Sequence, residues 1–203
     1  MNSKKKKIVF VSGKPDGINF KIARALRLKG YETILFTVSQ KSEYNIDLLK
    51  PAYNKVYYTD LNFRKDELKN PRKILKKFLR LIKLYYHARK IEPYIVIGVS
   101  FTNWTIAIAR RIFKKYPFIY FPYDITALRF PKKEDALKKK YNFELKSEKY
   151  CFEKCDGILT KGPLKALDLL KNTYIGKLSS DKNKISFLPY CSNEFVVPLN
   201  KNK

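Results

Sequence analysis

Short apolar runs alternate with segments of helical periodicity along almost the whole 203-residue chain, and this alternation limits the possible folds more than any other feature. The first run, Ile8–Ser12, ends at Gly13 and is typical of a strand buried on both faces. Ile18–Lys29 then shows a helical spacing of apolar residues, and Gly30 stands where a helix C-cap glycine belongs. A strand over Tyr31–Val38 follows, so the opening predicts a crossover between parallel strands.

The same alternation continues to the end of the chain. Further strands are predicted over Lys55–Thr59, Tyr94–Val99, Pro117–Pro122, Gly157–Thr160 and Ile185–Leu188. Further helices are predicted over Asn70–Lys90, Trp104–Lys115, Glu134–Lys154 and Pro163–Leu170. Asn70 and Pro71 suit the N-cap and first position of their helix, and Thr102 or Asn103 can cap the next one. The pattern predicts an α/β fold: a doubly wound, mainly parallel, Rossmann-like sheet of about seven strands with helices on both faces. We expect one domain over residues 1–199 and a polar tail over 200–203.

In a sheet of this kind, ligands bind at the loops beyond the carboxyl ends of the strands. Gly13 and Gly17 flank the first such loop, where glycine lets a ligand approach the backbone and the following helix N-terminus favours an anion. The loop sequence SGKPDG matches neither the dinucleotide-binding pattern nor the P-loop. An ordinary tight turn is therefore the alternative interpretation of these glycines.

Polar residues follow the fourth and fifth predicted strands. Ser100 begins the loop after the fourth strand, and Tyr123 and Asp124 come directly after the fifth. The Asp124 carboxylate could accept the proton of a substrate hydroxyl or hold a sugar by hydrogen bonds, or it could form an Asx-turn or helix cap. Arg129 could bind phosphate or pair with Asp124, and a structural ion pair is equally compatible with its position.

The remaining reactive side chains favour structural roles. The only histidine, His87, lies on a predicted helix away from the strand ends, which favours a packing or solvated role. Cys151 and Cys155 are four residues apart on a predicted helix, and we expect them to be small buried side chains. Neither an H-E-x-x-H motif nor a cysteine cluster indicates a metal site.

The charge is the unusual part of the composition. There are 44 Lys and Arg against 18 Asp and Glu, a formal net charge of +26. Such a field attracts nucleic acid, anionic lipid or phosphorylated substrates, although a Lys-rich proteome would give the same balance. The motifs by which RNA-binding modules stack and read bases are missing, so we do not expect nucleic acid as the partner.

The predicted helix over residues 70–90 is the main candidate for contact with an anionic surface. We expect its apolar stripe to pack against the sheet. The stripe consists of Ile74, Leu75, Phe78, Leu79, Ile82 and Tyr86. Its basic face would then either stay in water or contact anionic lipid mainly through charge. The apolar run near the N-terminus is too short for a signal peptide, so we expect a cytoplasmic protein that can lie at the inner face of a membrane.

Several segments, in order, resemble the N-terminal domain of GT-B glycosyltransferases of the family 4 type. KIVFVSGKPDGINFKIARALRLKGYETILFT resembles the family's opening strand, glycine loop and helix, with its "rGHEV" entry to the second strand. IEPYIVIGVS resembles the "kPDvvh" strand, and PFIYFPYDI resembles the strand that ends in "HD", with Asp124 in the aspartate position. FELKSEKYCFEKCDGILTKG resembles "E…r.aDgvitvS", in which Glu148, Asp156 and Gly157 match. ISFLPYCSNEFVVP resembles "viPNGvD…F.P".

The resemblance implies a lobe that binds the sugar acceptor and faces a second lobe that binds the nucleotide-sugar. It places Gly13 and Gly17 at the acceptor, and Tyr123 and Asp124 near the reacting hydroxyl. Tyr123 replaces the histidine of "HD", and the donor motif E-x7-E of the second lobe is not found in this chain. We therefore expect no cofactor on this lobe, a nucleotide-sugar on the other, and no transfer by this chain alone.

Two classes of function remain open at this stage. The first is the acceptor-binding half of a transferase that acts on a sugar or lipid-linked sugar together with a separate donor-binding chain. The second is a non-catalytic binding module of the same fold that recognises a glycan, an anionic membrane surface or nucleic acid.

Overall fold

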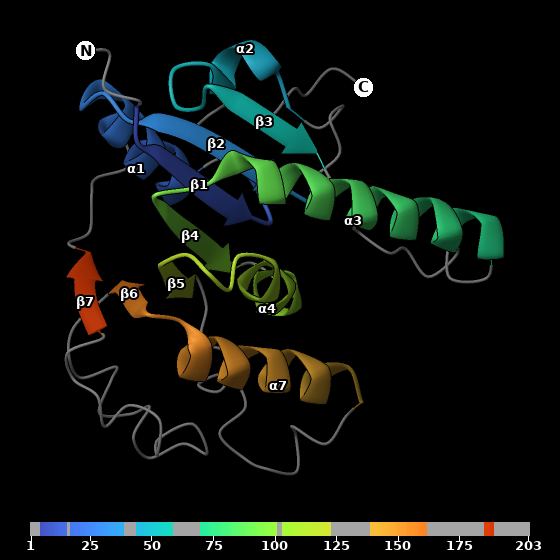
Figure 1. Ribbon diagram of the computed structural model, residues 1–203. Coiled ribbons are helices and arrows are strands. Elements are labelled where there is room, and N and C mark those ends of the chain that lie inside the picture. Colours follow the sequence, from blue (N-terminus) through green and yellow to red (C-terminus); the bar gives the residue numbers. More distant parts are fainter. Residues whose placement is uncertain are drawn as a thin grey trace. The chain divides into compact units, whose positions relative to one another are not determined.

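The structure is a computed structural model that describes residues 5–15, 17–38, 44–58, 70–100, 103–122, 139–161 and 185–188 (Figure 1). Its internal contacts divide the chain into two compact units. The first unit comprises Met1–Ile95 with Glu194–Lys203, and the second comprises Val96–Asn193. Both are built from parallel strands and helices, as the alternation in the sequence predicts.

The first unit contains three parallel strands in the spatial order β3-β2-β1. These are β1 (Lys7–Ser12), β2 (Glu32–Thr37) and β3 (Lys55–Tyr58). β1 and β2 pair without a bulge, from Lys7 opposite Glu32 to Ser12 opposite Thr37, so their carboxyl ends lie level at one edge. Val9, Phe10 and Leu35 are fully buried along these strands, which is why the central residues of both strands are apolar.

Three helices accompany these strands: α1 (Ile18–Leu28), α2 (Ile46–Leu49) and α3 (Pro71–Ile91). α1 ends as predicted, because Gly30 has φ of 90° and its N–H donates to the Arg27 carbonyl at 2.9 Å. α3 also begins as predicted: the Asn70 side chain accepts from the backbone N–H groups of Arg72 at 3.1 Å and Lys73 at 3.3 Å. The short helix α2 was not predicted from the sequence.

The apolar stripe predicted to pack α3 against the sheet is wrong for three of its members. Leu75, Leu79 and Tyr86 are 58%, 57% and 57% exposed. The buried face of α3 lies on the opposite side of the helix and includes Lys77 and Ala88. The long Lys77 side chain can bury its methylene groups in this way, so the helix needs fewer apolar residues on its packed face.

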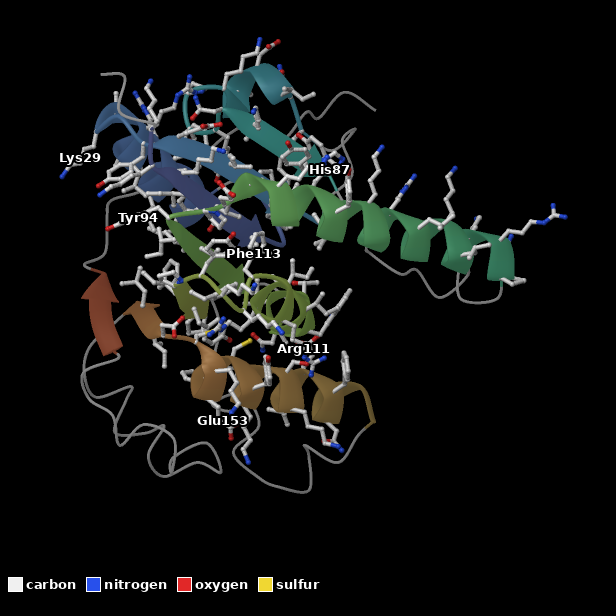
Figure 2. The ribbon with its side chains drawn as sticks, in the orientation of Figure 1. Lys29, His87, Tyr94, Arg111, Phe113 and Glu153 are labelled. Atoms are coloured by element: carbon white, nitrogen blue, oxygen red, sulfur yellow. The ribbon has the colours of Figure 1, made fainter. Side chains whose placement is uncertain are left out.

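His87 has a packing role, as the sequence favoured. Its ring stacks on the ring of Tyr57 in β3 at 5.7 Å between centroids, and Tyr57 stacks on Phe36 in β2 at 4.8 Å (Figure 2). This row of rings attaches the C-terminal half of α3 to the strands of its own unit. The Lys7 ammonium adds a hydrogen bond of 3.1 Å to the carbonyl of Ile91 at the end of the helix.

The second unit holds four parallel strands in the order β4-β5-β6-β7. These are β4 (Ile95–Ser100), β5 (Phe118–Pro122), β6 (Gly157–Lys161) and β7 (Ile185–Leu188). Its helices α4 (Asn103–Ile112) and α7 (Lys139–Lys154) pack against each other. The predicted start of the second helix, residues 134–138, and the predicted helix Pro163–Leu170 lie outside the described residues.

A glycine in the middle of β4 shows how tightly this unit is packed. A Cβ atom built on Gly98 would lie 2.6 Å from Cγ2 of Ile106 and 2.7 Å from Cε1 of Phe118. Ile106 comes from α4 and Phe118 from β5, and both are fully buried. Gly98 is therefore set by close packing of a helix and a neighbouring strand.

Candidate functional site

The loop between β1 and α1 is held in place by two side chains. The Ser12 hydroxyl donates to the carbonyl of Lys14 at 2.6 Å and accepts from the backbone N–H of Lys14 at 3.3 Å. The amide nitrogen of Asn19 donates to the Ser12 hydroxyl and to the Lys14 carbonyl, the latter at 2.6 Å. Ser12 and Asn19 are buried, so water cannot readily replace these bonds.

The neighbouring carbonyls of the loop are bound from β2 and from the segment before β3. The Thr37 hydroxyl donates to the Gly13 carbonyl at 3.2 Å, and the Tyr53 hydroxyl donates to the Pro15 carbonyl at 3.1 Å. The Tyr53 ring lies edge-on to Phe20 at 6.4 Å between centroids, which fixes the position of its hydroxyl. The acceptors of the loop are thus turned toward the protein.

The donors at the start of α1 are in a different situation. Gly17 is the N-cap, with φ of 69°, and it has no side chain that could cap the helix. Within the described part of the chain, no side chain accepts a hydrogen bond from the N–H groups of Ile18, Asn19 or Phe20. A Cβ atom built on Gly17 would meet nothing within 4 Å. This turn offers backbone donors and a positive helix end to an anion or a hydroxyl oxygen.

The start of α4 has the same place in its unit as the start of α1 but a different environment. The backbone N–H of Asn103, the first residue of α4, donates to Oε2 of Glu144 in α7 at 2.8 Å. A carboxylate of the protein therefore lies where an anionic ligand would bind a free helix N-terminus. The sequence predicted that Thr102 or Asn103 would cap this helix. Asn103 is the first residue of the helix, Thr102 lies outside the described residues, and the carboxylate that accepts from the Asn103 N–H belongs to a residue 41 positions away.

The Asn103 side chain is the centre of a buried polar network. Its amide nitrogen donates to Oε1 of Glu148 at 3.2 Å, and its amide oxygen accepts from the Tyr120 hydroxyl at 2.7 Å. Asn103, Glu148 and Tyr120 are all buried, at 2%, 0% and 0% exposure. The Cys151 thiol approaches the Asn103 carbonyl at 3.8 Å. A network buried to this degree specifies how α4, α7 and β5 fit together.

Cys151 and Cys155 are buried free thiols, as the sequence predicted. A hydrogen bond with Cys155, followed by burial, raises the pKa of Cys151 well above its usual range. Its thiol therefore stays protonated at neutral pH, which makes it a poor nucleophile.

Asp156, a residue of the segment that resembles the transferase family, has a structural position. Its carboxylate accepts from the backbone N–H of Phe118 at 2.9 Å, and its own N–H donates to the Phe118 carbonyl at 2.9 Å. Arg110 of α4 lies 3.4 Å from the same carboxylate and donates to the Lys154 carbonyl at 2.6 Å. Asp156 thus connects the start of β5 to the α7–β6 turn.

The predicted site residues divide into two groups. Gly13 and Gly17 lie at the β1–α1 turn, where the first is buried and the second exposed. Ser100 ends β4, and its side chain lies outside the described set. Tyr123, Asp124 and Arg129 also lie outside the described residues. The contribution of these four to a site remains a prediction.

Sequence reasoning missed the residues that shape both turns. Asn19 and Tyr53 hold the first turn, and Glu144 caps the second. An asparagine in the first turn of an amphipathic helix was a local signal for Asn19. Within the described ranges, no group of three or more His, Cys, Asp or Glu could hold a metal ion. No described helix combines the length and apolar character needed to cross a bilayer.

Comparison with known proteins gives a likeness of fold. No protein-family model matches the chain, and no curated protein matches it. Among solved structures it is similar to sucrose-phosphate synthase from Thermosynechococcus elongatus, with a TM-score of 0.64 and 12% identity over 93% of this chain and 49% of that one. It is also similar to UGT73P12 from Glycyrrhiza uralensis, solved with glycyrrhetinic acid 3-O-monoglucuronide, with a TM-score of 0.51 and 13% identity over 86% of this chain and 47% of that one.

These two structural neighbours are GT-B glycosyltransferases at low sequence identity. The α/β, Rossmann-like fold that the sequence predicts is therefore the fold of this chain. The chain spans about half the length of these two neighbours, at 49% and 47%.

Proposed function

We propose that this chain is the acceptor-binding half of a glycosyltransferase that moves a sugar from a nucleotide-sugar to a glycan or lipid-linked acceptor. Residues 1–199 would form one acceptor-side lobe of the family 4 type, active in cell-surface glycan synthesis together with a donor-binding domain or chain. The lobe would be inactive alone, because differential binding of the transition state needs both walls of the cleft. We place the protein on the cytoplasmic side, at the inner face of the membrane.

The β1–α1 turn is the observation that carries this proposal. Its carbonyls are bound by Ser12, Thr37 and Tyr53, whereas the first turn of α1 keeps its backbone donors beyond an N-cap glycine. A diphosphate or a sugar hydroxyl oxygen suits those donors, and the open space at Gly17 gives it access. In the complete enzyme, Asp124 would accept the proton of the reacting hydroxyl beside Tyr123, while Ser100 and Arg129 would hold the acceptor.

Two glycines with positive φ make a paired test. Gly17 and Gly30 both have positive φ, 69° and 90°, and both have open space where a Cβ would lie. Alanine at either position adds backbone strain of about 1–3 kcal/mol, with the larger value expected at Gly17, whose ψ is −137°. Only Gly17→Ala also places a methyl group at the proposed acceptor position.

We expect Gly17→Ala to weaken binding of a short-chain prenyl-diphosphate-linked monosaccharide about tenfold, and Gly30→Ala to leave it unchanged. Titration calorimetry with the intact lipid-linked monosaccharide, the free monosaccharide and the prenyl diphosphate would identify which part of the acceptor is recognised. Equal losses in the two variants, or no binding of any of the three probes, would contradict an acceptor site at this turn.

Adding a donor-binding half distinguishes the transferase from the binding-module alternative. A neighbouring α/β domain or reading frame that carries E-x7-E and restores transfer when mixed with this chain supports the transferase. Acceptor binding that persists while no such domain restores transfer supports the binding module.

A further inference from the structure

The exposed face of α3 carries an apolar strip beside a basic strip. Leu75, Leu79 and Tyr86 lie within an arc of about 40° at 3.6 residues per turn, and each is more than half exposed. The next part of the surface, about 60° to 100° around the helix, carries four cations. These cations are Arg72, Lys76, Lys83 and Lys90.

The two strips are long and straight. From Arg72 to Lys90 they extend about 27 Å at 1.5 Å per residue. The 21 residues of the helix contain eight Lys and Arg and no Asp or Glu. The Lys90 ammonium lies 4.2 Å from the centroid of the Tyr86 ring, so the cationic and apolar groups are in direct contact there. In Figure 1 the N-terminal turns of α3 extend beyond the strands of the first unit.

We propose that this face of α3 lies on an anionic lipid surface, with Leu75, Leu79 and Tyr86 inserted among the acyl chains and the neighbouring Lys and Arg bound to headgroup phosphates. Contact through charge alone would leave the leucines in water, whereas an interface accommodates both strips at once. The inference extends the location proposed above, at the inner face of the membrane. It does not depend on whether the chain takes part in sugar transfer.

The charge of the chain separates a membrane from the other possible occupants of this face. A second copy of a chain with net charge +26 would be repelled from a face that is itself basic. A nucleic acid would use the cations but gives no reason for a row of exposed leucines beside them. Anionic lipid offers negative charge and apolar surface in adjacent layers.

Vesicle flotation with the full chain tests the inference. The decisive variant is Leu75→Ser with Leu79→Ser, and the matched control is Leu28→Ser, because Leu28 is an 80% exposed leucine on α1. A second pair of variants tests charge: Lys76→Gln with Lys83→Gln on α3, against Lys114→Gln with Lys115→Gln, which are exposed lysines after α4. All four variants change exposed side chains, so folding should be retained, which circular dichroism would verify.

We expect the native chain to float with phosphatidylglycerol-rich vesicles, to stay in solution with pure phosphatidylcholine, and to keep part of its binding at high salt. The double serine variant should bind about tenfold more weakly or worse, and the α3 lysine pair should lower binding at low salt. Both controls should bind like the native chain. Binding that is unchanged by the serine variant and abolished by salt would overturn insertion. Absence of vesicle binding would overturn the membrane assignment and leave the acceptor proposal intact. The same conclusion would follow if the chain did not bind vesicles and sedimentation showed self-association that the serine variant abolishes.

Discussion

The β1–α1 turn and the β4–α4 turn occupy the same position in their respective units, yet their helix starts differ. At the first, an exposed glycine forms the N-cap, and the loop carbonyls are bound by Ser12, Thr37 and Tyr53. At the second, Glu144 caps the helix with a carboxylate, and Asn103 is buried in a network with Glu148 and Tyr120. At the first turn no described side chain accepts from the helix N-terminus, and at the second Glu144 accepts from the N–H of Asn103.

This difference teaches that the position of a loop in an α/β fold does not decide whether it binds a ligand. Both turns lie beyond the carboxyl ends of parallel strands, where ligands usually bind. A helix N-terminus that already holds the protein's own carboxylate is a poorer site for an anionic ligand, because the two would compete for the same donors and repel each other. The comparison favours the β1–α1 turn as the ligand-binding one, and mutations at the two turns should therefore have different consequences.

The largest effect is expected from Glu148→Ala at the second turn. The substitution removes a fully buried side chain, leaves a cavity and takes the acceptor away from the Asn103 amide. We expect a loss of about 3 kcal/mol in the free energy of unfolding, measured by urea denaturation.

Glu153→Ala is the matched control on the same helix. Glu153 is exposed, pairs with Lys149 at 3.9 Å, and lies on the side of α7 that faces away from α4 in Figure 2. It should change stability by less than about 0.5 kcal/mol. Similar losses in the two variants would mean that the network adds nothing to an ordinary helix position.

A smaller loss is expected from Gly98→Ala, in the strand that leads to the second turn. The added methyl group would lie 2.6 Å from Ile106, so α4 or β5 must move. We expect destabilisation of about 2 kcal/mol, seen as a lower urea midpoint with an unchanged slope. Gly98→Ala as stable as the native chain would show that this unit is loosely packed and would weaken the contrast with the open Gly17.

Strands and helix ends were more predictable than the side-chain contacts at either turn, for a physical reason. Strands, their parallel order and the Asn70 and Gly30 helix ends follow from local patterns, and the structure confirms them. The cap by Glu144 joins residues 41 positions apart, and no residue spacing within a helix or strand predicts such a contact. The exposed leucines of α3 were assigned to the wrong side because a buried Lys77 takes part of the packed face, and apolar periodicity does not detect a buried lysine stem.

The smallest change in the free energy of unfolding is expected from Asn19→Ala at the first turn. The Lys14 carbonyl keeps its bond from the Ser12 hydroxyl, and alanine is a better helix former than asparagine, so the net loss should be about 1 kcal/mol or less. The consequence should instead be local, because Asn19 is what joins the loop to α1. Amide hydrogen exchange of the loop before α1 should become about tenfold faster, while the amides of the β4–α4 turn should exchange as before. A loss as large as that of Glu148→Ala would mean that the first turn is as much a part of its unit's core as the second. The two turns would then not differ in kind, and the argument that places the ligand at the first of them would fail.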